Sequence, residues 1–156
     1  MVELLGLEPH PEGGFFRETF RSRHSLSASG ERGVRSASTA IYFLLPAGAF
    51  STFHRIQGSD EIWHHYGGDA VEIHTIAEDG EHRANVLGGR LEEGEQPQIL
   101  VTAGTLQASV ARGPRAALCG CTVTPGFDFA DFAMPSRDEL LLRFPRHADL
   151  IRRLAR

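Results

Sequence analysis

Apolar and polar residues alternate along this chain in short runs that glycine and proline interrupt. Such runs occupy residues 38–46, 51–56, 60–66, 70–76, 97–104, 105–111 and 116–126. Strands at this spacing are typical of an all-β sandwich or barrel. Between them, Asp79 and Gly80 suit a tight hairpin, and Gly67 and Gly68 suit a turn that needs a positive φ angle. The pattern therefore predicts an all-β fold with short connections.

The C-terminal region changes to a helical pattern. Ser136 and Glu139 have the spacing of a capping box in "PSRDELLLRF", and Pro145 is placed to begin a second short helix. We expect these helices to form a lid or brace on a single domain spanning residues 1–156. The polar stretch 21–38 is expected to be a mobile loop.

Composition narrows the possible functions. A net charge of -4 leaves no basic footprint for nucleic acid or an anionic membrane surface. The chain has no apolar run of the roughly 20 residues that a spanning helix needs, and its start lacks the layout of a signal peptide, so a cytoplasmic location is expected. All sixteen basic residues are arginine, which excludes lysine Schiff-base chemistry. Cys119 and Cys121 share one face of a predicted strand and are expected to be reduced, inert thiols.

The stretch "STFHRIQGSDEIWHHYGGD", residues 51–69, contains three of the eight histidines and the only tryptophan. If residues 52–56 and 60–66 are strands, one face carries the side chains of His54, Glu61, Trp63 and His65. The interior of a small barrel would place such a set around one ligand, with an aromatic wall and a few polar groups.

This stretch resembles the first motif of the cupin superfamily, in which histidines on a strand are followed by a glutamate and a glycine turn. His54, Glu61 and Gly68 match that frame. The segment "VTAGTLQAS" resembles the second motif, with Gly104 in place and Gln107 where the motif has a histidine.

Further segments extend the resemblance from about Leu5 to Phe144. In order, "HPEGGFFRETFRS", "STAIYFLL", "LVTAGTLQAS" and "CTVTPGFDFADF" are similar to one branch of small, mostly uncharacterised single-domain cupins. The resemblance implies a double-stranded β-helix barrel, commonly a homodimer, with a pocket of the kind found in sugar-nucleotide epimerases.

A divalent transition metal is one expectation for this pocket. His54, Glu61 and Gln107 are the candidate ligands, because imidazole and oxygen donors suit such ions. The resemblance also implies that the site is incomplete, since Ile56 and Gln107 stand where the usual set of three histidines and one glutamate has its other two histidines. A metal-free pocket is the alternative.

Acid–base chemistry is the leading hypothesis. A histidine and a carboxyl group that face one cavity can pass protons, which makes an isomerase or epimerase of a sugar-like or other oxygen-rich metabolite possible, with His54 and Glu61 as the catalytic residues. The residues expected to contact the ligand are Trp63, His65, Gln107, Tyr42 and Arg17. Three alternatives stay open: a non-enzymatic binding or sensor protein, a metal-dependent oxygenase or lyase, and a pocket in which Glu61 and His54 only satisfy each other.

Overall fold

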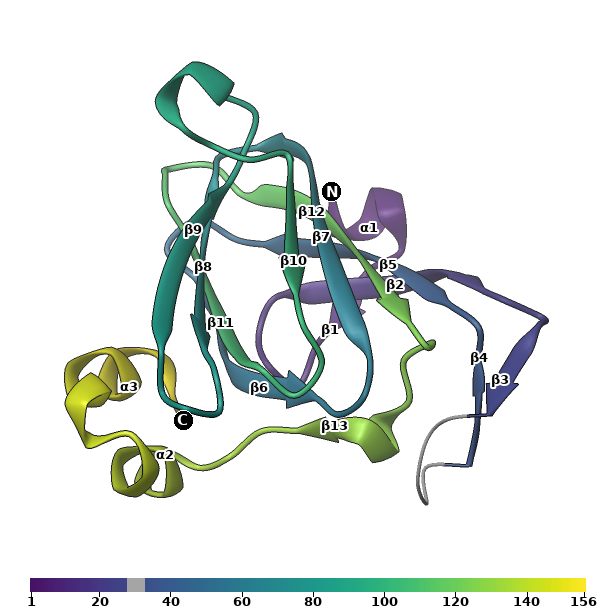
Figure 1. The fold of residues 1–156 in the computed structure, drawn as a ribbon. Coiled ribbons are helices and arrows are strands. Elements are labelled where there is room, and N and C mark those ends of the chain that lie inside the picture. Colours follow the sequence, from purple (N-terminus) through teal and green to yellow (C-terminus); the bar gives the residue numbers. More distant parts are fainter. Residues whose placement is uncertain (28–32) are drawn as a thin grey trace.

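The computed structural model describes residues 1–27 and 33–156, and most of its strands form two antiparallel sheets that face each other (Figure 1). The six-stranded sheet has the order β1-β2-β5-β12-β7-β10 and the five-stranded sheet the order β13-β6-β11-β8-β9. The strands of the first sheet are β1 (Glu8–Pro9), β2 (Phe15–Arg21), β5 (Thr39–Leu45), β7 (Asp60–Gly68), β10 (Gln98–Val101) and β12 (Ala117–Thr124). Those of the second are β6 (Phe50–Ile56), β8 (Val71–Ile76), β9 (His82–Leu87), β11 (Leu106–Ala111) and β13 (Phe132–Ala133). The all-β prediction is confirmed.

Each predicted run became a strand because its alternate residues are buried between the sheets. This core contains Trp63, Phe43, Ile73, Leu87 and Ile99 among others, and the two cysteines Cys119 and Cys121 belong to it. Gly68 has φ 85°, and a Cβ atom there would collide with the carbonyl oxygen of Ala116. A glycine is therefore required where β7 ends.

The remaining elements lie outside the barrel. They are α1 (Val2–Leu5), η2 (Leu91–Glu93), η3 (Phe129–Asp131), α2 (Arg137–Arg143), η4 (Pro145–His147) and α3 (Ala148–Leu154), and the two-stranded sheet of β3 (Ser25–Ser27) and β4 (Val34–Ser36). This small sheet corrects the expectation that all of residues 21–38 form a loop, while residues 28–32 lie outside the described part. No helix in the described part combines the length and apolar character required to cross a membrane.

The two C-terminal helices pack against the outer face of the five-stranded sheet, near β6 (Figure 1). Both arms of the predicted capping box are present, since Ser136 accepts from the Glu139 backbone and Glu139 accepts from the Ser136 backbone. A second apolar cluster joins the helices to the sheet through Phe53, Leu140 and Ile151. The helices therefore brace β6 from outside, while the opposite face of β6 borders the barrel interior.

Candidate functional site

A cavity of about 350 Å³ opens at one end of the barrel. Its polar groups are the side chains of His10, Glu12, His54 and Glu61, together with Glu18, Arg21, Thr39 and Asp128. The rest of its lining is mainly apolar and includes five phenylalanine rings. A volume and lining of this kind suit one small organic molecule.

His54 and Glu12 form a buried pair in the lining of this cavity. The Nδ1 atom of His54 lies 2.8 Å from the Thr52 carbonyl oxygen, which can only accept, so Nδ1 carries the hydrogen and Nε2 keeps its lone pair. That Nε2 atom lies 3.1 Å from Oε2 of Glu12. Burial lowers the pKa of His54 to about 4, and burial together with the nearby Glu61 raises the pKa of Glu12 well above its ordinary value. These shifts favour a neutral imidazole and a protonated Glu12, whose O–H then donates to Nε2 of His54.

Two glycines bring Glu12 into the barrel. Gly13 and Gly14 have φ angles of 114° and 72°, and a Cβ atom on Gly13 would lie only 2.6 Å from the carbonyl oxygen of Phe50. The Glu12 carbonyl oxygen accepts a 2.8 Å hydrogen bond from the backbone of Thr52, next to the carbonyl that holds His54. The "EGG" segment therefore reaches close against β6, which no residue with a side chain could do without a shift.

His10 is the second residue of the cavity that the sequence-based prediction omitted. Its Nδ1 atom accepts from the Glu12 backbone at 3.4 Å and lies 3.5 Å from Oε2 of Glu12, and burial lowers its pKa to about 4. The signal that could have revealed His10 and Glu12 was the pair of glycines that follows them, because such glycines permit a close backbone approach.

Glu61 belongs to a hydrogen-bonded chain that begins at Trp63. The Trp63 indole N–H can only donate, and it donates to Oε1 of Gln107 at 2.9 Å. The Gln107 amide group must therefore turn its Nε2 atom to Glu61, whose Oε2 atom accepts from it. Burial raises the pKa of Glu61. The ring nitrogens of His54 face Thr52 and Glu12, so the alternative in which Glu61 and His54 satisfy each other is not what the structure shows.

Trp63 lies in the core beside the cavity. Its side chain is 1% exposed, packs edge to face on Phe43 at 5.4 Å between ring centres, and is absent from the cavity lining. It shares the inner face with Glu61 as predicted, but it fills the core beside the cavity. Gln107 is likewise buried behind Glu61 and does not line the cavity.

Three other residues predicted to contact the ligand lie elsewhere. The Arg17 guanidinium lies over the Tyr42 ring at 5.6 Å, and Tyr42 in turn meets Tyr66 edge to face. These rings occupy the outer face of the six-stranded sheet, because the neighbours of Tyr42 on β5 face the cavity. His65 borders a separate cleft, with its Nε2 atom 3.3 Å from the Asp69 carbonyl oxygen.

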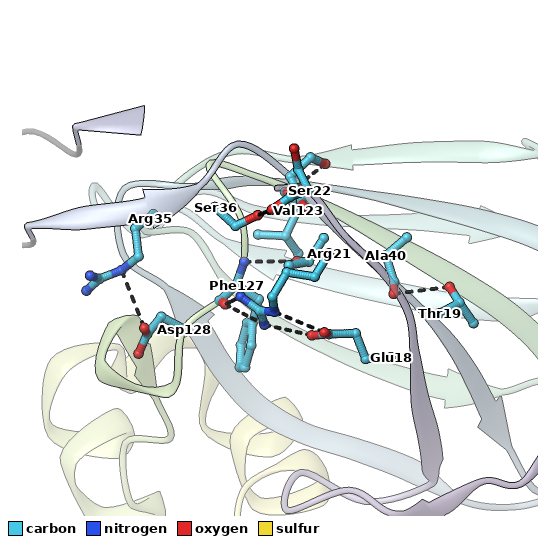
Figure 2. Close-up of polar contacts among 12 residues, drawn as sticks. Glu18, Thr19, Arg21, Ser22, Arg35, Ser36, Ala40, Val123, Phe127 and Asp128 are labelled. Carbon is cyan, nitrogen blue, oxygen red and sulfur yellow. Dashed lines mark hydrogen bonds and ion pairs between the residues drawn. The ribbon is translucent and has the colours of Figure 1, made fainter. Parts of the chain in front are cut away.

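Arginine side chains tie the rim of the cavity together. Arg21 binds both carboxylate oxygens of Glu18, at 2.9 and 2.7 Å, and donates to the Phe127 carbonyl oxygen at 3.2 Å (Figure 2). Arg35 binds Asp131 at 2.8 Å and lies 3.9 Å from Asp128. These contacts fasten β2 and β4 to the segment that follows β12, so the aromatic side of the opening is held in place.

The donor set does not fit the metal expected from the resemblance. Gln107 presents N–H rather than oxygen to Glu61, Ile56 has no donor atom, and the free nitrogen of His54 is engaged by Glu12. Across residues 1–27 and 33–156, no group of three or more histidine, cysteine, aspartate or glutamate side chains is arranged to hold a metal ion.

Comparison with known proteins agrees with this architecture. A solved structure from Shewanella oneidensis superposes with a TM-score of 0.91 at 38% identity, covering 99% of this chain and 94% of that one. A hypothetical protein from Leishmania major also gives 0.91, at 33% identity and with 99% and 96% covered. A double-stranded β-helix protein from Klebsiella pneumoniae, at 14% identity and a TM-score of 0.54, shares the fold alone.

Sequence comparison gives the same family. An uncharacterised protein of Saccharomyces cerevisiae is 30% identical over 146 residues, which cover 84% of this chain and 72% of the yeast protein. The family model described as "Cupin superfamily (DUF985)" matches residues 1–135, which is all of the barrel. The chain, with its double-stranded β-helix and short C-terminal helices, therefore belongs to the cupin superfamily.

Proposed function

We propose that this cupin binds a small organic molecule in the cavity and isomerises or epimerises it by acid–base catalysis. The observation that carries the proposal is the buried pair of Glu12 and His54, which places a carboxyl group and an imidazole 3.1 Å apart in the wall of a ligand-sized cavity. Glu61, a second carboxyl group with a raised pKa, borders the same space. General acid–base catalysis needs such groups within hydrogen-bond reach of the reacting atoms.

The pair can store and return one proton. When the Glu12 proton moves to Nε2 of His54, the Glu12 carboxylate becomes a base that can take a proton from the carbon beside a carbonyl group. Glu61 gives its own proton to the carbonyl oxygen, so the ligand becomes a neutral enol. Return of a proton to carbon, and of the enol proton to Glu61, completes an isomerisation or inverts the carbon centre.

Deuterium exchange tests this proposal even while the natural product of the reaction is unidentified. A carbonyl compound that fits the cavity is incubated with the protein in deuterated water, and proton NMR follows the hydrogens beside its carbonyl group. We expect exchange in the wild type and a loss of roughly a hundredfold or more in Glu12→Gln and Glu61→Gln, with binding retained. Glu92→Gln, an exposed glutamate on η2, is the matched control and should exchange like the wild type.

Other outcomes of the exchange experiment have definite meanings. Binding that is retained in every variant, with no catalysed exchange in the wild type, would favour the non-enzymatic binding or sensor protein. Exchange that survives in Glu12→Gln would show that this pair is not the reactive centre.

The homodimer expected from the sequence stays a prediction, as does the cytoplasmic location. The outer face of the six-stranded sheet exposes Ile62, Tyr66 and Leu100, an apolar group that a second copy would cover. Light scattering after size exclusion should give twice the mass of the 156-residue chain. A monomer at micromolar concentration would contradict the prediction.

A further inference from the structure

Aromatic rings dominate the wall of the cavity. They belong to Phe16 on β2, Phe43 on β5, Phe127 after β12, Phe129 on η3 and Phe132 on β13. Three of the rings, those of residues 127, 129 and 132, meet edge to face in a triangle with centre distances of 5.0, 5.8 and 6.0 Å. Phe129 is 57% exposed, so burial of its ring contributes little to the stability of the fold, and the ring is available to a ligand.

The inner part of the cavity contains no permanent cation. Arg21 is the only arginine in the described lining, and both Glu18 and the Phe127 carbonyl oxygen already engage it at the rim. His10 and His54 are neutral near pH 7, because burial holds the pKa of each at about 4. A carboxylate or phosphate placed there would be buried without a cationic partner, which weakens its binding.

The inner groups instead suit a hydrogen-bond acceptor. Burial raises the pKa of Glu12 and that of Glu61, which favours the protonated form of each. The O–H of Glu12 is engaged by Nε2 of His54, so Glu61 is the carboxyl group that can offer an O–H to a ligand. A carbonyl oxygen accepts from such a donor. A sugar fits this distribution poorly, because its hydroxyl groups surround the ring and most would face phenyl walls with no partner.

We propose that the ligand is an uncharged carbonyl compound with an aromatic ring, an aryl-substituted ketone or aldehyde. Its ring packs against the triangle of Phe127, Phe129 and Phe132, and its carbonyl oxygen accepts from Glu61. This class replaces the oxygen-rich metabolite expected from the sequence. It rests on the proposed function only for the role of Glu61.

Three simple probes separate the classes of ligand. Benzylacetone carries a phenyl ring and a ketone, hydrocinnamate has a similar skeleton with a carboxylate, and xylose is an uncharged sugar. Calorimetry at pH 7 should show benzylacetone binding at least about tenfold more tightly than hydrocinnamate, with no measurable binding of xylose. Equal or tighter binding of hydrocinnamate or xylose, or no binding of benzylacetone, would overturn the proposal.

Two phenylalanine variants locate the bound ring. Phe129→Ala should weaken benzylacetone binding about two- to tenfold, because it removes an aromatic contact with the bound ring. Phe20→Ala is the matched control, since Phe20 is 54% exposed but lies outside the cavity lining. Both side chains are exposed, so neither change threatens folding. An equal effect of the two variants would place the ligand elsewhere and refute the assignment.

Deuterium exchange in the same samples keeps this inference distinct from the proposed function. Benzylacetone that binds without exchange would support the ligand class and refute the catalytic role. Exchange on a sugar or a carboxylate, without benzylacetone binding, would refute the ligand class and leave the acid–base function standing.

Discussion

Thr52 connects the candidate site with the C-terminal helices, and replacing it by valine tests that connection. Its backbone N–H donates to the Glu12 carbonyl oxygen, its own carbonyl accepts from His54, and its hydroxyl donates to the Leu154 carbonyl oxygen at 3.0 Å. Valine has nearly the same shape and keeps both backbone bonds. The change therefore removes one hydrogen bond between β6 and the end of α3.

The expected cost follows from burial. Thr52 is 5% exposed, so the bond lies inside the structure. Without the Thr52 hydroxyl, the Leu154 carbonyl oxygen loses this buried donor. An unsatisfied buried acceptor costs about 1 to 3 kcal/mol. Guanidinium unfolding, followed by circular dichroism, should show a free energy of unfolding lower by that amount with an unchanged slope.

Thr19→Val is the matched control. The Thr19 hydroxyl donates to the Ala40 carbonyl oxygen at 3.1 Å, a bond of the same kind at an exposed position (Figure 2). Water replaces the lost donor there, so the expected change is within about 0.5 kcal/mol. If Thr52→Val costs no more than Thr19→Val, the bond to α3 does not stabilise the fold and the reasoning fails.

Burial also determines how the protein should respond to acid, to thiol reagents and to loss of its tryptophan. The raised pKa of Glu12 and the lowered pKa of His54 offset each other between about pH 4.5 and 6.5, because the folded and unfolded chains hold the same number of protons on this pair. In Glu12→Gln only His54 titrates, and between these pH values it binds a proton in the unfolded chain but not in the folded one. Acidification across that range should therefore lower the free energy of unfolding of this variant by about 2 kcal/mol more than that of the wild type. Unfolding experiments that give parallel pH profiles for the two proteins would contradict this. Burial raises the pKa of Cys119 to about 12 and that of Cys121 well above its usual range, so a thiol reagent should modify both only after unfolding, and rapid reaction of the native protein would refute it. Trp63→Ala should lower the free energy of unfolding by about 3 to 5 kcal/mol, whereas a tryptophan at a ligand wall would cost much less.

Strand alternation was sufficient to predict an all-β fold, and the resemblance to cupins added the double-stranded β-helix. Alternation placed His54 and Glu61 on the inner face, because side chains alternate strictly across a sheet. Alternation does not indicate how far along the barrel axis each side chain lies. His65 shares a strand with Glu61 but lies four residues further on, about 13 Å away, and so borders a different cleft.

Alternation also says nothing of contacts between distant segments. Glu12 lies outside any periodic run and reaches His54 only because Gly13 and Gly14 let the backbone pass close to β6. The position of Trp63 depends on its size, which alternation also does not take into account. Its large side chain fills the core between the sheets, and phenyl rings line the cavity beside it.

The protonation state of His54 tests the central claim most directly. Nitrogen-15 NMR of histidine-labelled protein reports the charge and the tautomer of each imidazole ring as the pH is changed. The account predicts that His54 is neutral at pH 7, with hydrogen on Nδ1 and a hydrogen-bonded lone pair on Nε2, and that its pKa lies at about 4. A charged imidazolium at pH 7, or a neutral ring with its hydrogen on Nε2, would contradict the account.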